Sequence, residues 1–406
     1  MGTSMKFKAA AGVLGVLTLA GLAAWVYQLV FGLGVTGMNN GTSWGLYITM
    51  FMFFVGLSAG GLIVASSASV FHVAEYKKVA LPAVILSTVC ICLAGMFVLI
   101  DLGGIQRVWQ IIASPNPASP LFWDICVITL YLAINVVYLY FMVSKKADES
   151  KVAIVSRFAL PVAILVHSVT AWIFGLEMAR EGWYSAIMAP LFVVSAMDSG
   201  LALLVLSLMG LNKANVFKTD KKLLSNLAGL LAACIAIDGF LVGCEVLTMA
   251  YPGASGAETL AIMATGATAP FFWFEIVVGI IVPFVILVFA KNRERMGLVT
   301  AASVCVVLGV LAKRAWLLLT SFVEANVAGA PGIIAGSSSA AQATGTDLWA
   351  TASSYAPTWV EIAVVVGVIS LGVLAFMVLS RKLLKHNRAE RPSSADAEQG
   401  AVATVA

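Results

Sequence analysis

The stretch WGLYITMFMFFVGLSAGG at 44–61 decides the fold class. It is apolar over the length of several helical turns, it opens with a Trp and a Tyr, and it closes with small residues. An apolar helix with a small-residue face lies close against other helices in lipid, where packing drives association. The stretch therefore predicts a membrane-embedded helix with an aromatic mouth suited to a flat, apolar ligand.

The composition of the whole chain agrees with a multi-pass membrane protein. Of the 406 residues, 61% are hydrophobic and 11% are charged, against about 25% charged in soluble domains. The net charge of +4 comes from short basic loops and does not indicate nucleic acid binding. The six cysteines all fall in apolar segments without a CxxC motif, so we expect neither an iron–sulfur cluster nor a zinc site in this chain.

Ten apolar segments have the length that a bilayer crossing requires. The predicted spans are 10–35, 44–73, 80–103, 120–143, 153–178, 188–210, 223–251, 270–290, 297–322 and 358–380. We expect a transmembrane domain over 1–385 and a disordered cytoplasmic tail over 386–406. The Ala-, Gly- and Ser-rich loop at 324–357 reads as flexible, or as ordered only against a partner.

The loops predict the topology. Twenty of the 24 Lys and Arg residues lie on one side, and only Arg107, Arg180, Lys313 and Arg314 lie towards the other. The positive-inside rule then places both termini in the cytoplasm, which fits a plasma (inner) membrane protein. Most tryptophans gather at the opposite, outer side, either as an aromatic belt or as a docking surface for a partner.

Acidic residues follow the tryptophans towards the outer ends of the spans. Together with the four basic residues just named they predict a polar layer inside the bundle, and ionisable groups at membrane depth indicate function. The acidic residues are Asp101, Asp124, Glu177, Glu181, Glu245, Glu275 and Glu361.

One internal repeat is visible. FFVGLSAGG at 53–61 resembles FVVSAMDSG at 192–200, with Phe53 and Phe192 each eight residues before a glycine, Gly61 and Gly200. A chance match is the alternative. The repeat predicts two four-helix bundles, about 44–178 and 188–322, related by an axis along the membrane normal and flanked by the first and last spans.

Histidine is scarce, and its placement argues against haem. His72 lies near the inner end of span 2, His167 lies near the middle of span 5, and His386 is in the tail. Two axial ligands at equal depth are therefore not expected. His167 has two interpretations, a proton relay with a pKa near neutrality or a helix–helix hydrogen bond. Glu177, Asp198 and Asp238 extend a candidate proton path, with an ion pair to Arg180 as the alternative for Glu177 and inter-helix hydrogen bonds for the two aspartates.

Several stretches together resemble the polysulfide-reductase membrane-subunit family, also called NrfD-like, in its ten-span form. The resemblance covers most of the chain and rests on the order of the stretches rather than on any single one. They are WGLYI and GLSAGG within 44–61, DLGGIQRVWQ at 101–110, PNPASPLFWD at 115–124, HSVTAWIF at 167–174, GWYSAIMAPLFV at 182–193, FFWFEIVVGIIVP at 271–283 and YAPTWVEI at 355–362.

The resemblance implies a quinone-reactive anchor without haem. Such subunits pair with a four-cluster iron–sulfur subunit and a molybdopterin catalytic subunit at the outer face. The quinone pocket is implied near the outer face of the first bundle, around Trp44, Tyr47, Asp101, Arg107 and Tyr131. Two departures concern this pocket: Gly104 and Ile105 replace the Arg-Pro of the family's DLGRP motif, and span 2 has Tyr47 and Phe51 where some members have Asn and His.

The expected chemistry is oxidation of menaquinol or a related quinol. Asp101 is the first candidate for the proton acceptor, which must lie within hydrogen-bond reach. Arg107 would orient Asp101, Tyr47 would donate to a quinone carbonyl, and His167 would assist. Polysulfide, thiosulfate, tetrathionate, arsenate and a sulfoxide are all open as terminal substrates. The alternatives are a proton-conducting subunit of a larger redox complex and a secondary transporter.

Overall fold

The computed structural model of the chain describes residues 5–39, 41–71, 73–144, 149–180, 182–251, 254–323 and 355–390. Ten of its helical segments are long and apolar enough to cross a membrane, and no strand occurs in the described residues. The expectation of an all-α protein with ten spans is therefore confirmed. The spanning segments are α1 (Met5–Phe31), α2 (Leu46–Val70), α4 (Ala80–Asp101), α6 (Pro120–Val143), α7 (Glu149–Gly175), α8 (Met188–Lys213), α9 (Lys221–Ala250), the consecutive α11 (Ala269–Phe274), η3 (Glu275–Ile281) and α12 (Val282–Val288), α14 (Met296–Val323) and α15 (Trp359–Glu390).

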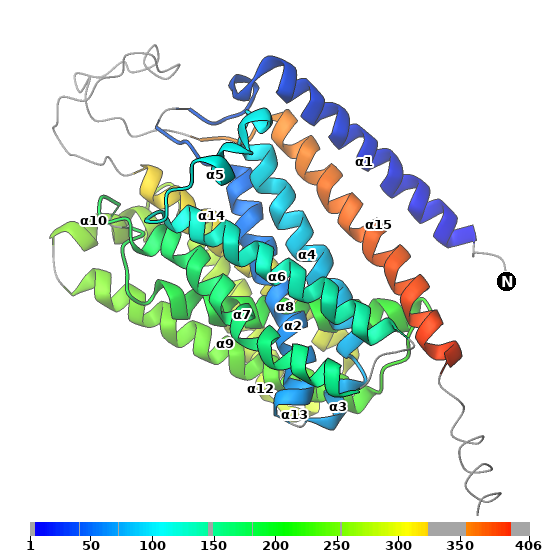
Figure 1. Cartoon of the computed structure of the whole chain (residues 1–406). Helices are drawn as coiled ribbons and strands as arrows, with labels where there is room; N and C mark the ends of the chain where they lie inside the picture. The colour runs from blue at the N-terminus through cyan, green and yellow to red at the C-terminus, as the bar shows by residue number, and fades with distance from the viewer. Residues whose placement is uncertain are drawn as a thin grey trace, which may run out of the picture.

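Short elements connect these segments at the two ends of the bundle (Figure 1). One end carries η1 (Leu33–Val35), η2 (Ile105–Arg107), α5 (Gln110–Ala113) and α10 (Ala254–Ala264), and we call it the aromatic face. The other end carries α3 (Ala74–Lys77) and α13 (Ala290–Arg293), and we call it the basic face. The start of α1 and the end of α15 both lie at the basic face (Figure 1). Its assignment to the cytoplasm stays a prediction.

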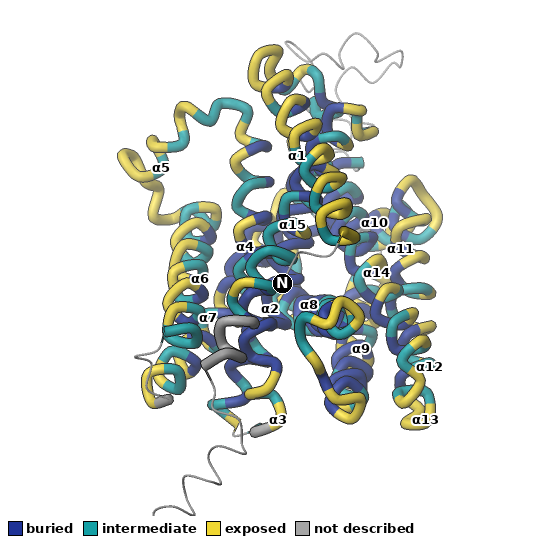
Figure 2. The backbone as a smooth tube through the Cα atoms, turned by 90° about the vertical axis from the view of Figure 1, so that its right-hand side faces the viewer, coloured by how far each residue is buried: buried dark blue, intermediate teal, exposed yellow. Residues whose placement is uncertain are grey.

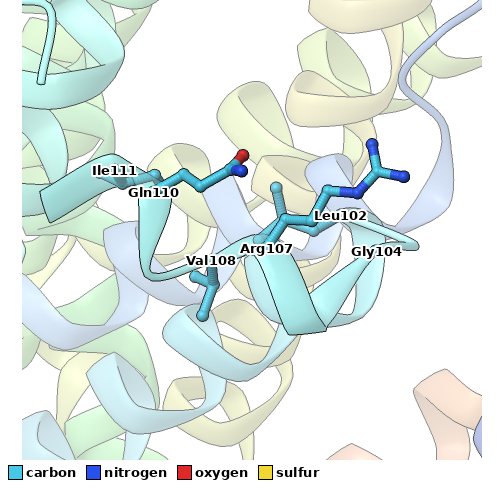
Figure 3. A pocket seen from close by; sticks show the side chains of 6 residues that line it. All are labelled: Leu102, Gly104, Arg107, Val108, Gln110 and Ile111. Atoms are coloured by element: carbon cyan, nitrogen blue, oxygen red, sulfur yellow. The ribbon is translucent and has the colours of Figure 1, made fainter. Parts of the chain in front are cut away.

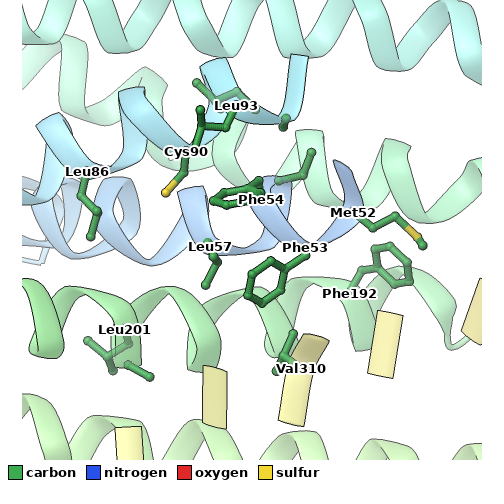
Figure 4. Packing of buried hydrophobic residues seen from close by; sticks show 14 of the residues in the cluster. Met52, Phe53, Phe54, Leu57, Leu86, Cys90, Leu93, Phe192, Leu201 and Val310 are labelled. Carbon is green, nitrogen blue, oxygen red and sulfur yellow. The ribbon is translucent and has the colours of Figure 1, made fainter. Parts of the chain in front are cut away.

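Helix α2, which contains the opening stretch, is the central element. Its apolar window is 94% buried, whereas that of α1 is 11% buried, and Figure 2 shows the same contrast between the two helices. Phe53, Phe54 and Leu57 of α2 lie among buried side chains of its neighbours (Figure 4). Helix α2 packs against α4, α7, α8 and α14, so every side of it is covered by protein rather than lipid.

The helix contacts form two groups that meet at α2 and α8. Helix α2 belongs with α4, α6 and α7, whereas α8 belongs with α9, η3, α12 and α14. Helices α1 and α15 pack against each other, and α15 also packs against α4. The predicted residue limits of the two bundles, the 1–385 domain and the 386–406 tail stay predictions.

A glycine pair lets the two groups approach closely. A Cβ atom on Gly60 of α2 would lie 2.2 Å from the carbonyl carbon of Gly200 of α8, and a Cβ on Gly200 would lie 2.4 Å from the nitrogen of Gly60. Only a residue without Cβ fits this crossing. The repeat aligned Gly61 with Gly200, but Gly61 instead faces the carbonyl of Ala83 on α4.

The structure differs from the expectation in three local features. Helix α15 continues to Glu390, ten residues beyond the predicted end of the last span. The eighth span contains the π-helical turn η3, which no apolar pattern reveals. Helix α10 was not expected. Most of the predicted flexible loop, residues 324–354, lies outside the described residues.

Candidate functional site

Asp101 is the last residue of α4 and lies beside a sharp turn at the aromatic face. Gly103, two residues later, has φ +62, a conformation that glycine adopts without strain. The turn sends the chain across the end of α4 into η2 and α5. The Oδ1 atom of Asp101 is buried and has no hydrogen-bond partner, so this carboxyl group retains a free acceptor.

A pocket that is open to the surface follows Asp101 in the same segment, and Asp101 is not among the residues that line it. Its volume is about 410 Å³, within the roughly 300–1,000 Å³ typical of small-molecule pockets. It is lined by Leu102, Gly104, Arg107, Val108, Gln110 and Ile111. Arg107 and Gln110 extend to the same side of the segment, whereas Val108 points the other way (Figure 3). No ion pair joins Arg107 to Asp101, although both are described, so the expected orienting contact is not formed in this structure.

Tyr47 lies on the inner side of this segment and is tied to the first helix. Its hydroxyl donates to Oε1 of Gln28 on α1 at 2.6 Å, and Gln28 Nε2 donates to the carbonyl of Ile100 at 3.0 Å. Both side chains are buried. We had expected Tyr47 to donate to a quinone carbonyl. In the structure its hydroxyl proton is directed at Gln28 instead.

A second carboxyl group, Glu361 on α15, lies near Tyr47 and Asp101. Glu361 is fully buried and accepts hydrogen bonds from the Tyr355 hydroxyl and from the backbone N–H groups of Gly37 and Thr358. It interacts electrostatically with both Tyr47 and Asp101. Burial and the neighbouring Glu361 raise the pKa of Tyr355 well above its usual range, so this tyrosine stays a hydrogen-bond donor.

Trp44 lies apart from Tyr47. It stacks on Trp183 with ring centroids 6.1 Å apart and meets the edge of Phe174 at 5.9 Å. Arg180 lies over the Trp183 ring and donates to the carbonyl of Ser321. These contacts place Trp44 at the junction of the two helix groups rather than in the cavity of Figure 3.

Tyr131 lies deeper than the cavity. Its hydroxyl donates to the carbonyl of Ser58 at 3.0 Å and lies 2.9 Å from Ser87 Oγ. Ser87 is fourteen residues, or about 21 Å, below Asp101 along α4. Tyr131 thus joins α2, α4 and α6 at a level remote from Asp101.

His167 on α7 also lies below the cavity. Its Nε2 is 3.0 Å from the carbonyl of Val55 on α2, and its Nδ1 is 2.6 Å from the carbonyl of Ala163. A neutral imidazole donates from only one nitrogen, so the neutral ring makes a hydrogen bond to one of these two carbonyls. One turn away, Thr170 donates to the buried carboxyl group of Asp124 at 2.6 Å. Neither pair contacts Asp101.

The second helix group contains a buried ionic cluster. Lys313 Nζ lies 2.9 Å from Asp238 Oδ1 and 3.2 Å from Glu275 Oε1. Asp198 is buried nearby, whereas Glu177 is exposed in the loop after α7. Of the predicted proton path, the structure brings together Asp198 and Asp238 only.

Among the residues that sequence reasoning left out of these sites are Gln28, Glu275, Lys313 and Glu361. The last three stood out as ionisable residues in apolar spans, and only the fold shows which neighbours they meet. Gln28 gave no comparable signal. Among the described residues no group of three or more His, Cys, Asp or Glu side chains is placed to hold a metal ion. His72 lies outside the described residues.

The segment 34–326 matches the profile of the family described as "Polysulphide reductase, NrfD". The chain belongs to this family. The match spans every element around the cavity except Gln28 on α1 and the Tyr355–Glu361 segment of α15, and it confirms the resemblance that the ordered stretches indicated.

Three proteins to which the chain is similar are named as subunits of oxidoreductases. The chain is 38% identical to a putative dimethyl sulfoxide reductase membrane subunit of Halobacterium salinarum, with 92% of this chain and 90% of the relative covered. It is 28% identical to the "Hdr-like menaquinol oxidoreductase integral membrane subunit" of Archaeoglobus fulgidus, with 78% and 80% covered. It is 24% identical to the "Probable Ni/Fe-hydrogenase 2 b-type cytochrome subunit" of Escherichia coli, with 91% of each covered.

The family membership supports a quinone-interacting membrane anchor of an oxidoreductase complex, with a role in respiratory electron transport. One of the three relatives is named as a b-type cytochrome subunit. The absence of haem from this NrfD-family chain therefore stays a prediction.

Proposed function

We propose that this chain oxidises menaquinol, or a related quinol, beside Asp101 at the aromatic face. Its partners in this proposal are a four-cluster iron–sulfur subunit, which accepts the electrons, and a molybdopterin catalytic subunit beyond it. The aromatic face is the outer side of the plasma membrane, and both termini are cytoplasmic. The chain itself holds no haem and no iron–sulfur cluster.

One observation carries the proposal: the buried Oδ1 of Asp101 has no hydrogen-bond partner, and residues that directly follow Asp101 in the chain line a pocket of about 410 Å³. Oxidation of a quinol releases two electrons and two protons, and each proton needs an acceptor within hydrogen-bond reach. Asp101 takes one proton from a quinol hydroxyl and water at the aromatic face takes the second, while Arg107 and Gln110 bind the polar rim of the ring. Both electrons leave to the partner, since the chain has no redox group of its own in this account.

The neighbours of Asp101 leave its Oδ1 atom free to bind a ligand. Tyr47 is held by Gln28, and Glu361 is saturated by three donors. Neither group therefore competes with a ligand for the Asp101 oxygen. Tyr131 and His167 lie deeper, and we assign them to helix–helix contacts rather than to the quinol ring.

The aromatic face suits a partner protein. Large apolar side chains stand in solvent there, outside or at the ends of the spanning helices. Their exposed fractions are 60% for Trp109, 84% for Ile112, 75% for Met178 and 89% for Tyr251. Apolar side chains gathered at one surface mark protein or membrane contacts. Trp109 and Ile112 belong to the segment that lines the cavity, so a partner bound here would also cover it.

The names of two relatives support one direction of electron flow. One of them is a reductase subunit and another is a menaquinol oxidoreductase subunit. By analogy, we infer that this chain draws electrons from the quinol pool for a terminal reductase.

The proposal is tested on the complex purified from native membranes through a tag on this chain. An iron–sulfur protein should co-purify, and addition of a reduced naphthoquinol should reduce its clusters, as followed by electron paramagnetic resonance. Asp101→Asn should abolish that reduction, while Asp220→Asn, a surface variant at the basic face, should not. If the tagged chain purifies without an iron–sulfur protein, or if the clusters are fully reduced in Asp101→Asn, the proposal is contradicted.

A further inference from the structure

The second helix group encloses five ionisable side chains in its apolar interior. Asp198 (α8), Asp238 (α9) and Glu275 (η3) face Lys313 and Arg314 of α14, and each of the five is at most 2% exposed. Lys313 bridges two of the acids, with Nζ 2.9 and 3.1 Å from the Asp238 oxygens and 3.2 Å from Glu275 Oε1. Burial of this many charges in an apolar span is costly unless they are paired.

Among the other contacts of the cluster, one oxygen of Asp198 has no hydrogen-bond partner. Arg314 donates to Ser195 Oγ at 2.6 Å, and its guanidinium lies 4.0 Å from the centroid of the Phe192 ring. Glu275 also accepts from Trp316 Nε1. Asp198 Oδ1 is buried, has no hydrogen-bond partner, and interacts electrostatically with Asp238, Lys313 and Arg314.

The charge count requires a bound proton. Three carboxylates and two cations would leave one uncompensated negative charge far from water, which is strongly disfavoured. One proton makes the cluster neutral. Asp238 and Glu275 both contact Lys313, so Asp198 is the carboxyl group that retains the proton. A metal cation does not fit, because the Lys313 ammonium already occupies the space between two of the acids.

An irregular helix supports a functional role for this cluster. Glu275 is the first residue of the π-helical turn η3, which Pro283 of α12 closely follows. Gly279 in this turn packs on Gly309 of α14, where a Cβ on Gly309 would lie 2.2 Å from the Gly279 Cα. π-Helical turns are rare and are frequent at functional sites. Here the turn places Glu275 against Lys313.

A further buried carboxyl group lies between the cluster and the aromatic face. Glu245 lies seven residues beyond Asp238 on α9, or about 10 Å further towards that face. It is buried, its Oε2 has no partner, and it lies near Lys313 and within reach of Ser185 in the loop after α7. The other titratable groups facing the cluster are Cys234 on α9 and, across α2, His167 on α7.

Towards the basic face the same helices present a mostly apolar layer, with Ser199 of α8 and Ser303 of α14 among the exceptions. On the three helices that bound the cluster, every one of the following side chains is at most 2% exposed: Leu201, Leu204, Val205, Leu208, Leu227, Leu231, Val299 and Val306. Ser303 is the one buried polar side chain of α14 between its start and the cluster.

We propose that Asp198, with Asp238, Glu275, Lys313 and Arg314, forms a proton-binding site that exchanges its proton with the aromatic face through Glu245. Exchange begins with a neutral Glu245, which gives its proton to water at the aromatic face and takes the Asp198 proton in its place. Asp198 is then a carboxylate until a proton returns by the same route. The apolar layer prevents the same exchange with the basic face. This site is separate from the quinol cavity and does not depend on it.

The test is infrared spectroscopy of the purified full chain in lipid nanodiscs. The wild type should show a carbonyl stretching band of a protonated carboxylic acid, which Asp198→Asn removes and Asp220→Asn retains. Asp198→Glu covers the case in which the amide variant does not fold, since it should shift the band rather than remove it. An unchanged band in both Asp198 variants would overturn the site.

The route is tested by the rate at which this band shifts after transfer to heavy water. Glu245→Gln should slow the shift at least several-fold, and Ser303→Ala should leave the rate unchanged. A rate that falls in Ser303→Ala and not in Glu245→Gln would contradict exchange with the aromatic face.

Discussion

The Tyr47 hydroxyl donates to Gln28 Oε1 at 2.6 Å, and this bond joins the first helix to the central helix α2 beside Asp101. Gln28 in turn donates to the last turn of α4 through the carbonyl of Ile100. Three helices are thus fixed at the end of α4, next to Asp101. Helix α1 lies outside the two helix groups, yet it supports the site in the first.

Substitution of Gln28 should therefore destabilise the chain. Gln28→Leu leaves the buried Tyr47 hydroxyl unpaired, at a cost of about 1–3 kcal/mol. Unfolding in detergent should show this loss, while Gln106→Leu, at an exposed position, should show little. The double variant Gln28→Leu/Tyr47→Phe removes both partners and should lose less than the sum of the single variants. Strict additivity would argue against the bond.

The crossing of α2 and α8 depends on a missing side chain. Gly60→Ala would place Cβ 2.2 Å from the backbone carbonyl carbon of Gly200, so the two helices must separate. Overpacking of this kind costs about 1–3 kcal/mol. Gly95→Ala on α4 is the matched control, because nothing lies within 4 Å of its Cβ position. Equal stability of the two variants, measured by unfolding in the same detergent, would refute the crossing.

Lys313 should matter far more than a surface lysine. Lys313→Met leaves Asp238 and Glu275 buried without their cation, and breaking such a pair costs about 3–5 kcal/mol. Lys78→Met breaks the exposed pair with Asp220 and should cost no more than about 1 kcal/mol. Adding Asp238→Asn to Lys313→Met should restore part of the stability. A double-mutant cycle on the unfolding free energy measures this coupling, and a coupling near zero would speak against the pair.

Tyr355 should contribute to stability in a pH-dependent way. Burial and Glu361 raise its pKa above the usual value of 10.0, so the folded chain keeps this proton where the unfolded chain loses it. The contribution is complete below pH 10 and is lost as the pH rises towards the raised pKa. Tyr355→Phe should lower the melting temperature at pH 7. Above pH 10, the melting temperature of this variant should fall less steeply with pH than that of the wild type. Tyr140→Phe, on an exposed face of α6, should keep the wild-type decline, and the same decline in Tyr355→Phe would exclude this role.

The sequence predicted the ten spans because apolar length is a local property. The segment 120–143 was placed to the residue, and the small residues at 60–61 correctly indicated close packing. The neighbours that each side chain contacts depend on how distant helices pack, so they are not a local property of the sequence. Trp44 and Tyr47 are three residues apart, yet one meets the loop after α7 and the other meets α1.

The site itself was predicted only in part, for the same reason. Asp101 and Arg107 entered the predicted pocket through the family resemblance, with Asp101 also noted at the end of a span, and their role stays a prediction. Glu361 and Gln28 come from the flanking helices, and their proximity to Asp101 depends on how α1 and α15 pack. Tyr131 was placed by resemblance in the pocket, but its depth along α6 brings it to Ser58 and Ser87 instead.

The central claim is that Asp101 binds the quinol in the cavity of Figure 3. The most direct test is a titration of the purified chain with a fluorescent hydroxyquinoline N-oxide, a quinol analogue, in nanodiscs. The wild type and the surface variant Asp220→Asn should bind it saturably with the same affinity. Loss of a hydrogen bond to a charged group costs about 1.5–3 kcal/mol, so Asp101→Asn should bind the analogue at least tenfold more weakly. An unchanged affinity in Asp101→Asn would contradict the account.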